Sequence, residues 1–172
     1  MKTKFIFATL LLLGVQSISQ GGSRLDDFDT AKTAFSAKSE CTHPKVLGAS
    51  YDHGDLANCV MGDSRTVVYE LEKSRKDEQV QRAKITWFDF DAQNPTGVRQ
   101  YAPHGDRNDA ERYLGNFLET YAPCRKAEVE TSFFEGKGCE CDIQDGAYKI
   151  SVQQFDNPSL TERTVEIRPN RP

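Results

Sequence analysis

The sequence has no apolar run long enough to span a bilayer. Its longest run, from Phe5 to Val15, has 11 residues, whereas a transmembrane helix needs about 20. Two lysines precede this run, and Ser17 and Ser19 follow it at the spacing that a signal peptidase recognises. We therefore expect residues 1–19 to be a cleaved signal peptide and residues 20–172 to be the mature protein, exported to a bacterial periplasm or secreted into the medium.

The sequence also lacks the motifs that would fix a chemistry. It contains no G-x-S-x-G nucleophile elbow, no H-E-x-x-H zinc motif, no glycine-rich phosphate loop and no D-x-D-x-D-G calcium loop. These absences lower the expectation of an enzyme without removing it. We expect no cofactor and no metal ion.

Basic residues are in the minority. The chain has 22 lysines and arginines against 26 aspartates and glutamates, a net charge of −4, and removal of the leader with its two lysines makes the protein more acidic. A phosphate backbone or an anionic membrane surface would be repelled, whereas a basic protein would be attracted over long range. The charge therefore excludes nucleic acid as a partner and favours another protein, although solubility alone also explains the acidity.

Large apolar side chains are present in sufficient number for a folded core. The sequence has 10 phenylalanines, 6 tyrosines and 1 tryptophan, which can bury enough surface to offset the entropy of the chain. Apolar residues recur at helical spacing over residues 23–38 and, most regularly, 109–121. Runs typical of strands cover residues 45–51, 65–72, 80–90, 127–134, 147–155 and 163–168.

The order of these elements predicts an α+β fold built from two similar units. Residues 23–92 and residues 103–169 each run helix, cysteine, strand, cysteine, strand, strand. This order suggests a tandem repeat in a single domain, with the helices packed on antiparallel sheet. No residue string is shared between the halves, so coincidence remains the alternative.

Five cysteines in an oxidising compartment leave one without an intramolecular partner. We predict disulfides between Cys41 and Cys59 and between Cys124 and Cys139, each stabilising the fold by about 3 kcal/mol. Cys141 is an alternative partner for Cys124, because residues 139 and 141 face the same side of a strand. The odd cysteine could link two chains into a dimer. The Cys139/Cys141 pair could otherwise be a redox centre, but its turn-rich acidic surroundings disfavour a thiolate.

Two histidines occur in a repeated His-Gly-Asp sequence, at His53 and His104. A histidine beside a carboxylate can act as a general base. Glycine and aspartate are also ordinary turn residues, and turns are the preferred interpretation. An exported hydrolase that uses these histidines, or a thiol-redox enzyme, is the alternative function.

An aromatic stretch supplies the predicted binding residues. Trp87 must face the side of its strand opposite to Phe88 and Phe90, so the strand is either buried on both faces or presents an aromatic patch. Tyr51 and Tyr101, in predicted loops, are candidate neighbours of that patch. The leading functional hypothesis is an exported protein-binding module, such as an inhibitor or an immunity-type factor.

Overall fold

The computed structural model describes residues 25–37, 41–49, 54–62, 64–90, 107–158 and 160–170. The predicted signal peptide lies outside these residues. The helices are α1 (Phe28–Ser36), α2 (Arg107–Tyr121), a short 3-10 turn η1 (Pro123–Arg125) and α3 (Lys126–Glu135). The strands are β1 (Cys41–Leu47), β2 (Leu56–Met61), β3 (Val67–Lys73), β4 (Val80–Asp89), β5 (Cys139–Ile143), β6 (Tyr148–Asn157) and β7 (Leu160–Pro169).

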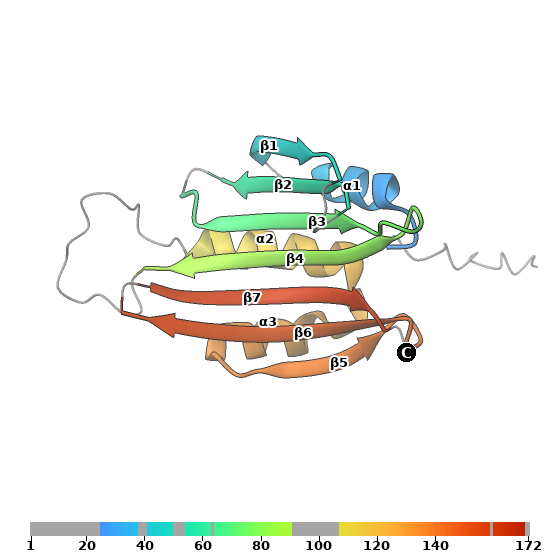
Figure 1. Cartoon of the computed structure of the whole chain (residues 1–172). Helices are drawn as coiled ribbons and strands as arrows, with labels where there is room; N and C mark the ends of the chain where they lie inside the picture. Colours follow the sequence, from blue (N-terminus) through green and yellow to red (C-terminus); the bar gives the residue numbers. More distant parts are fainter. Residues whose placement is uncertain are drawn as a thin grey trace, which may run out of the picture.

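The strands form one antiparallel sheet in the order β1-β2-β3-β4-β7-β6-β5. Figure 1 shows the helices together on one face of this sheet, with α2 behind β4 and α3 behind β6 and β7. The predicted α+β class, with helices on antiparallel sheet, is confirmed. None of the described helices is long and apolar enough to cross a membrane.

The two predicted units meet at the centre of the sheet. The last strand of the first half, β4, pairs with the last strand of the second half, β7, with Ile85 opposite Val165. The halves are not equivalent, because four strands follow α1 whereas three strands follow α2 and α3. The predicted tandem repeat is therefore not confirmed.

One predicted strand is a helix. The apolar pattern predicts a strand over residues 127–134, but residues 126–135 form α3. Val129 and Phe133 are its buried residues, and their spacing of four places both on the same side of a helix. The helix ends at Gly136, whose φ of 68° is the left-handed conformation that glycine adopts most easily.

The other helices follow the predicted periodicity. In α2 the residues predicted to face the core are buried: Ala110, Tyr113, Leu114, Phe117, Leu118 and Tyr121. In α1 the N-cap is Asp27, whose side chain accepts a 2.7 Å hydrogen bond from the backbone N–H of Thr30. That hydrogen bond lowers the pKa of Asp27 and satisfies one of the free donors at the helix start.

An aromatic cluster joins the two halves in the core. Phe35 of α1 stacks on Tyr69 of β3, with 3.9 Å between ring centroids, and also contacts Phe117 and Tyr121 of α2. The hydroxyl oxygens of Tyr69 and Tyr121 lie 2.8 Å apart, and Tyr121 donates to the carbonyl oxygen of Ala31. Burial raises the pKa of Tyr69 well above its usual value. The hydrogen-bonded pair is thus satisfied within the core.

Two of the predicted strands form a hairpin, and the first predicted disulfide is present. β3 and β4 pair antiparallel, with Tyr69 opposite Ile85. Cys41 and Cys59 form a disulfide across β1 and β2, closing a loop of sequence separation 18. Cys59 is buried on the helix-covered face of the sheet, so the crosslink ties the edge strand β1 to the core.

Candidate binding surface

Alternate residues of each strand divide the sheet into two faces. On β4, Ala83, Ile85 and Trp87 are buried beneath the helices. Arg82 and Lys84 point to the opposite side, because successive side chains in a strand alternate. We call this second side the open face, since the helices that the structure describes all lie on the other side (Figure 1).

The centre of the open face carries paired charges. Glu70 of β3 lies opposite Lys84 of β4 and forms an ion pair with it. Arg82 of β4 pairs with Glu72 at 3.0 Å and lies 3.9 Å from Glu70. On this part of the face each cation therefore lies against a carboxylate.

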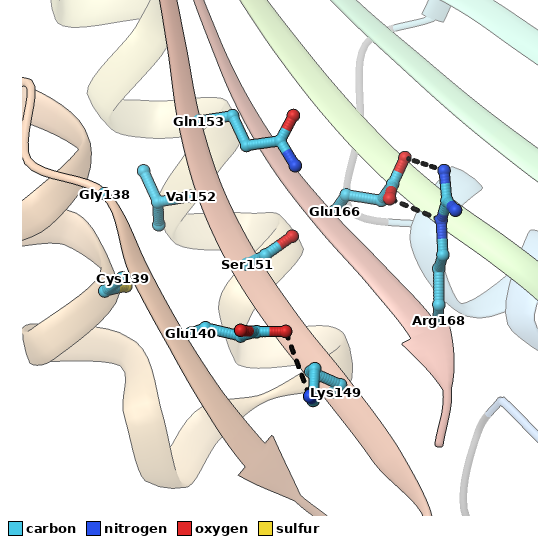
Figure 2. A pocket seen from close by; sticks show the side chains of 9 residues that line it. All are labelled: Gly138, Cys139, Glu140, Lys149, Ser151, Val152, Gln153, Glu166 and Arg168. Atoms are coloured by element: carbon cyan, nitrogen blue, oxygen red, sulfur yellow. Dashed lines mark hydrogen bonds and ion pairs between the residues drawn. The ribbon is translucent and has the colours of Figure 1, made fainter. Parts of the chain in front are cut away.

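The charge pairs continue into a groove over β5, β6 and β7 (Figure 2). Lys149 of β6 pairs with Glu140 of β5 at 3.0 Å, and Arg168 donates to its neighbour Glu166 on β7. The hydrogen bond that Lys149 donates to Glu140 raises the pKa of Lys149, so Lys149 is charged at neutral pH. The groove has a volume of about 530 Å³ and is lined by Gly138, Cys139, Glu140, Lys149, Ser151, Val152, Gln153, Glu166 and Arg168.

An aromatic row crosses one end of the open face. Phe88 of β4 lies opposite Glu162 of β7, and Glu162 lies opposite Phe155 of β6. Phe155 is 64% exposed, and Phe88 is half-buried. We call Phe88, Glu162 and Phe155 the aromatic row. Aromatic side chains are enriched at contact sites for other proteins.

Trp87 is not part of an exposed patch. Its side chain is only 3% exposed and packs on the helix-covered face, with its ring centroid 6.2 Å from that of Phe133 in α3. The guanidinium of Arg163 lies 5.1 Å from the indole centroid. Trp87 therefore does not supply the expected exposed aromatic patch, because its strand buries the face that it shares with Ala83 and Ile85.

The other predicted binding residues have different outcomes. Phe88 is on the open face as part of the aromatic row, and Phe90, just beyond β4, is half-buried. Tyr51 and Tyr101 lie outside the described residues. Sequence reasoning missed Phe155, although its position indicates its orientation: it lies an odd number of residues after Tyr148, Ile150 and Val152, which are buried. Phe155 must therefore point away from the core.

The remaining cysteines are free thiols in the structure. Cys124 in η1 is exposed, whereas Cys139 and Cys141 of β5 are partly buried and pack against the core from the same side of the strand. The predicted disulfide of Cys124 with Cys139 is not formed, and neither is the alternative with Cys141. Burial and the nearby Glu128 carboxylate raise the pKa of Cys141. This thiol is therefore protonated at neutral pH, which disfavours the redox interpretation.

The histidine site predicted as an alternative is not described by the structure. His53 and His104 both lie outside the described residues. Within the described part of the chain, no group of three histidine, cysteine, aspartate or glutamate side chains is arranged to hold a metal ion. The alternative of a hydrolase that uses these histidines stays a prediction.

Comparison with known proteins identifies no relative: no family model, no curated protein and no solved structure matches the chain.

Proposed function

We propose that this protein is an exported module that binds another protein through the open face of its sheet. The observation that carries the proposal is the aromatic row, in which Phe155 is 64% exposed. A phenylalanine on the outside of a folded domain exposes apolar surface that association would remove from water. Phe88 belongs to the same row, with Glu162 of β7 between the two rings, so the row offers a partner two aromatic contacts and one acidic contact.

The charges of the open face fit a protein partner better than a polyanion. Lys84 and Lys149 are each paired with a glutamate, so cations do not dominate the face. A face with both signs selects a partner whose own charges alternate in a complementary pattern. The net charge of −4 further favours a partner that is basic overall, because such a protein is steered towards this chain.

Export is part of the proposal. The disulfide between Cys41 and Cys59 is typical of an oxidising compartment, and the first 19 residues have the pattern of a secretory leader. A small exported protein that binds a second protein with its open face would act as an inhibitor or an immunity-type factor. The binding partner would be blocked or protected by the contact itself, without a chemical step.

The proposal is tested by changing Phe155 to serine. The wild-type protein and the Phe155→Ser variant, each tagged, are used to capture proteins from the native compartment side by side. We expect at least one partner to be captured by the wild type and lost with the variant, because truncation of an aromatic hot spot costs about 2 kcal/mol or more.

Leu47 offers a matched control. It is 48% exposed and lies on β1, at the opposite edge of the sheet from the aromatic row. The Leu47→Ser variant removes a comparable exposed apolar side chain and should retain the partner. If both variants capture the same proteins as the wild type, the aromatic row is not the contact site and the proposal fails.

A further inference from the structure

A second hollow lies beside the open face, at the turn between β3 and β4. It has a volume of about 370 Å³ and lies between this turn and the end of β7. Its lining consists of Ser74, Arg75, Lys76, Gln81, Arg168 and Pro169. Three of these six residues are cationic and none is acidic. We call this hollow the basic pocket.

The two carboxylates of the same turn are engaged elsewhere. Asp77 accepts a 3.2 Å hydrogen bond from the backbone N–H of Gln79, within the turn. Glu78 forms an ion pair with Lys73, which raises the pKa of that lysine. Neither acid lines the basic pocket. Among the described contacts, Lys76 forms no ion pair with either of these acids, so its ammonium group is available to a ligand.

The turn that carries Lys76 is held by its own hydrogen bonds. The backbone N–H of Lys76 donates to Ser74 Oγ over 3.2 Å, and the backbone N–H of Ser74 donates to the carbonyl oxygen of Gln79 over 2.8 Å. Ser74 is only 3% exposed. The backbone beneath the basic pocket is thus fixed in place, which reduces the entropy lost when a ligand binds.

Arg168 connects the basic pocket to the groove. It lines both hollows, and it lies directly opposite Lys149 of β6 on the open face. Two cations opposite each other across a pair of strands repel. Glu166 and Glu140 each offset one of them, and an anion placed between the pocket and the groove would add to that compensation.

We infer that the basic pocket binds carboxylate side chains of a short acidic segment of the partner, which continues along the groove. The inference rests on the proposed function, because the pocket adjoins the open face. At physiological ionic strength charges are screened beyond about 8 Å. The pocket therefore attracts a nearby carboxylate even though the chain as a whole is acidic and favours a partner that is basic overall.

The spacing of the cations along a turn and a strand end favours an extended segment with several carboxylates over a single phosphate group. Phosphate sites in proteins commonly use the backbone N–H groups of a helix N-terminus or a glycine-rich loop. The described lining here consists of strand and turn residues with three long cationic side chains. Lys76 can reach one carboxylate of an extended segment, and Arg168 can reach another while it keeps its contact with Glu166.

Binding of a hexaglutamate peptide to the intact, isotope-labelled protein tests the inference by NMR. We expect the backbone amide signals of Arg75, Lys76 and Arg168 to shift, and a hexalysine peptide to leave them unchanged. The Lys76→Gln variant should bind hexaglutamate about fivefold more weakly, the size expected for one partly exposed ion pair. Affinity should fall as salt is added.

Controls separate this inference from the proposed function. Lys137, 73% exposed and near the start of β5, is a matched lysine outside the pocket, and Lys137→Gln should bind hexaglutamate as the wild type does. The Phe155→Ser variant should also bind it normally, since that change leaves the pocket intact. Absence of shifts at the pocket, or equal weakening by Lys137→Gln, would overturn the inference while leaving the aromatic row untouched. Inorganic phosphate that binds as tightly as the peptide would also overturn it.

Discussion

The two faces of the sheet are made by the same strands and differ in almost every property. On β4, the helix-covered face carries Ala83, Ile85 and Trp87, all nearly inaccessible to solvent, whereas the open face carries Arg82 and Lys84. The covered face is specified by packing, because each of its side chains must fit the helices above it. The open face has no such constraint from the described helices, and the proposed contact with a partner would cover its exposed phenylalanine.

The largest contrast is expected between the two aromatic residues Trp87 and Phe155. Trp87→Ala removes a buried ring packed on Phe133, and we expect the free energy of unfolding to fall by about 3–5 kcal/mol. Phe155→Ala removes an exposed ring and should change it by no more than about 0.5 kcal/mol. Urea unfolding of both variants measures the difference. If both variants lose the same free energy of unfolding, Phe155 is needed for folding, and the two faces do not differ in the way described.

The disulfide is the next largest contribution on the covered face. Replacing both Cys41 and Cys59 with serine should lower the free energy of unfolding by about 2–4 kcal/mol, because the loop of sequence separation 18 is no longer closed in the unfolded chain. Urea unfolding of the double variant, compared with the wild type under reducing and oxidising conditions, measures this. The wild type should approach the variant when reduced. If the free energy of unfolding of the wild type is the same with and without reductant, the assigned disulfide is contradicted.

A smaller effect is expected for single hydroxyl groups on the two faces. Tyr69→Phe removes a buried hydrogen bond to Tyr121 and should cost about 1 kcal/mol. On the open face, Thr164→Val removes the 3.1 Å contact between the hydroxyl oxygens of Thr86 and Thr164 and should cost less.

The pH dependence of stability separates Tyr69 from Thr164. The folded pKa of Tyr69 is raised, chiefly by burial, so the folded protein holds this proton more tightly than the unfolded chain does. The resulting stability is present below pH 10, the ordinary tyrosine value, and is lost as the pH rises above it. Tyr69→Phe should reduce this alkaline loss, whereas Thr164→Val should retain it. Identical alkaline profiles for Tyr69→Phe and the wild type would contradict the assignment.

The smallest predicted effect concerns the thiols. Alkylation at neutral pH should modify the exposed Cys124 first and Cys141 several-fold more slowly, because burial raises the pKa of Cys141 and shields it. Mass spectrometry of peptides after timed alkylation gives both rates. A faster reaction at Cys141 would restore the redox interpretation of β5.

The sequence predicted the elements whose patterns have a single interpretation. The apolar spacing of residues 109–121 fits only a helix, and it is confirmed by α2. Residues 127–134 contain two adjacent phenylalanines and two glutamates, a pattern that fits either a strand or a helix. The segment is a helix because Val129 and Phe133 are then buried on the same side. Local sequence could not reveal that packing.

The sequence predicted part of the candidate site, because it shows which side chains share one face of a strand but not which face the helices cover. The sequence placed Trp87 and Phe88 on opposite sides of one strand, which is correct. It did not identify which face the helices cover, although Trp87 lies on the same face of the strand as the apolar residues Ala83 and Ile85. Phe155 was not identified from the sequence, because the neighbours of an outward-facing side chain depend on which strands pair with its own strand. The pairing of β6 with β7 and of β7 with β4 brings Phe155 into one row with Phe88.

Side-chain footprinting of the captured complex tests the central claim most directly. Hydroxyl radicals oxidise exposed aromatic side chains, and Phe155 is 64% exposed in the free protein. The account predicts that oxidation of Phe155 falls several-fold in the complex, while partly buried Phe134 on α3, at the helix layer, reacts as in the free protein. Unchanged oxidation of Phe155 together with protection of the helices would contradict it.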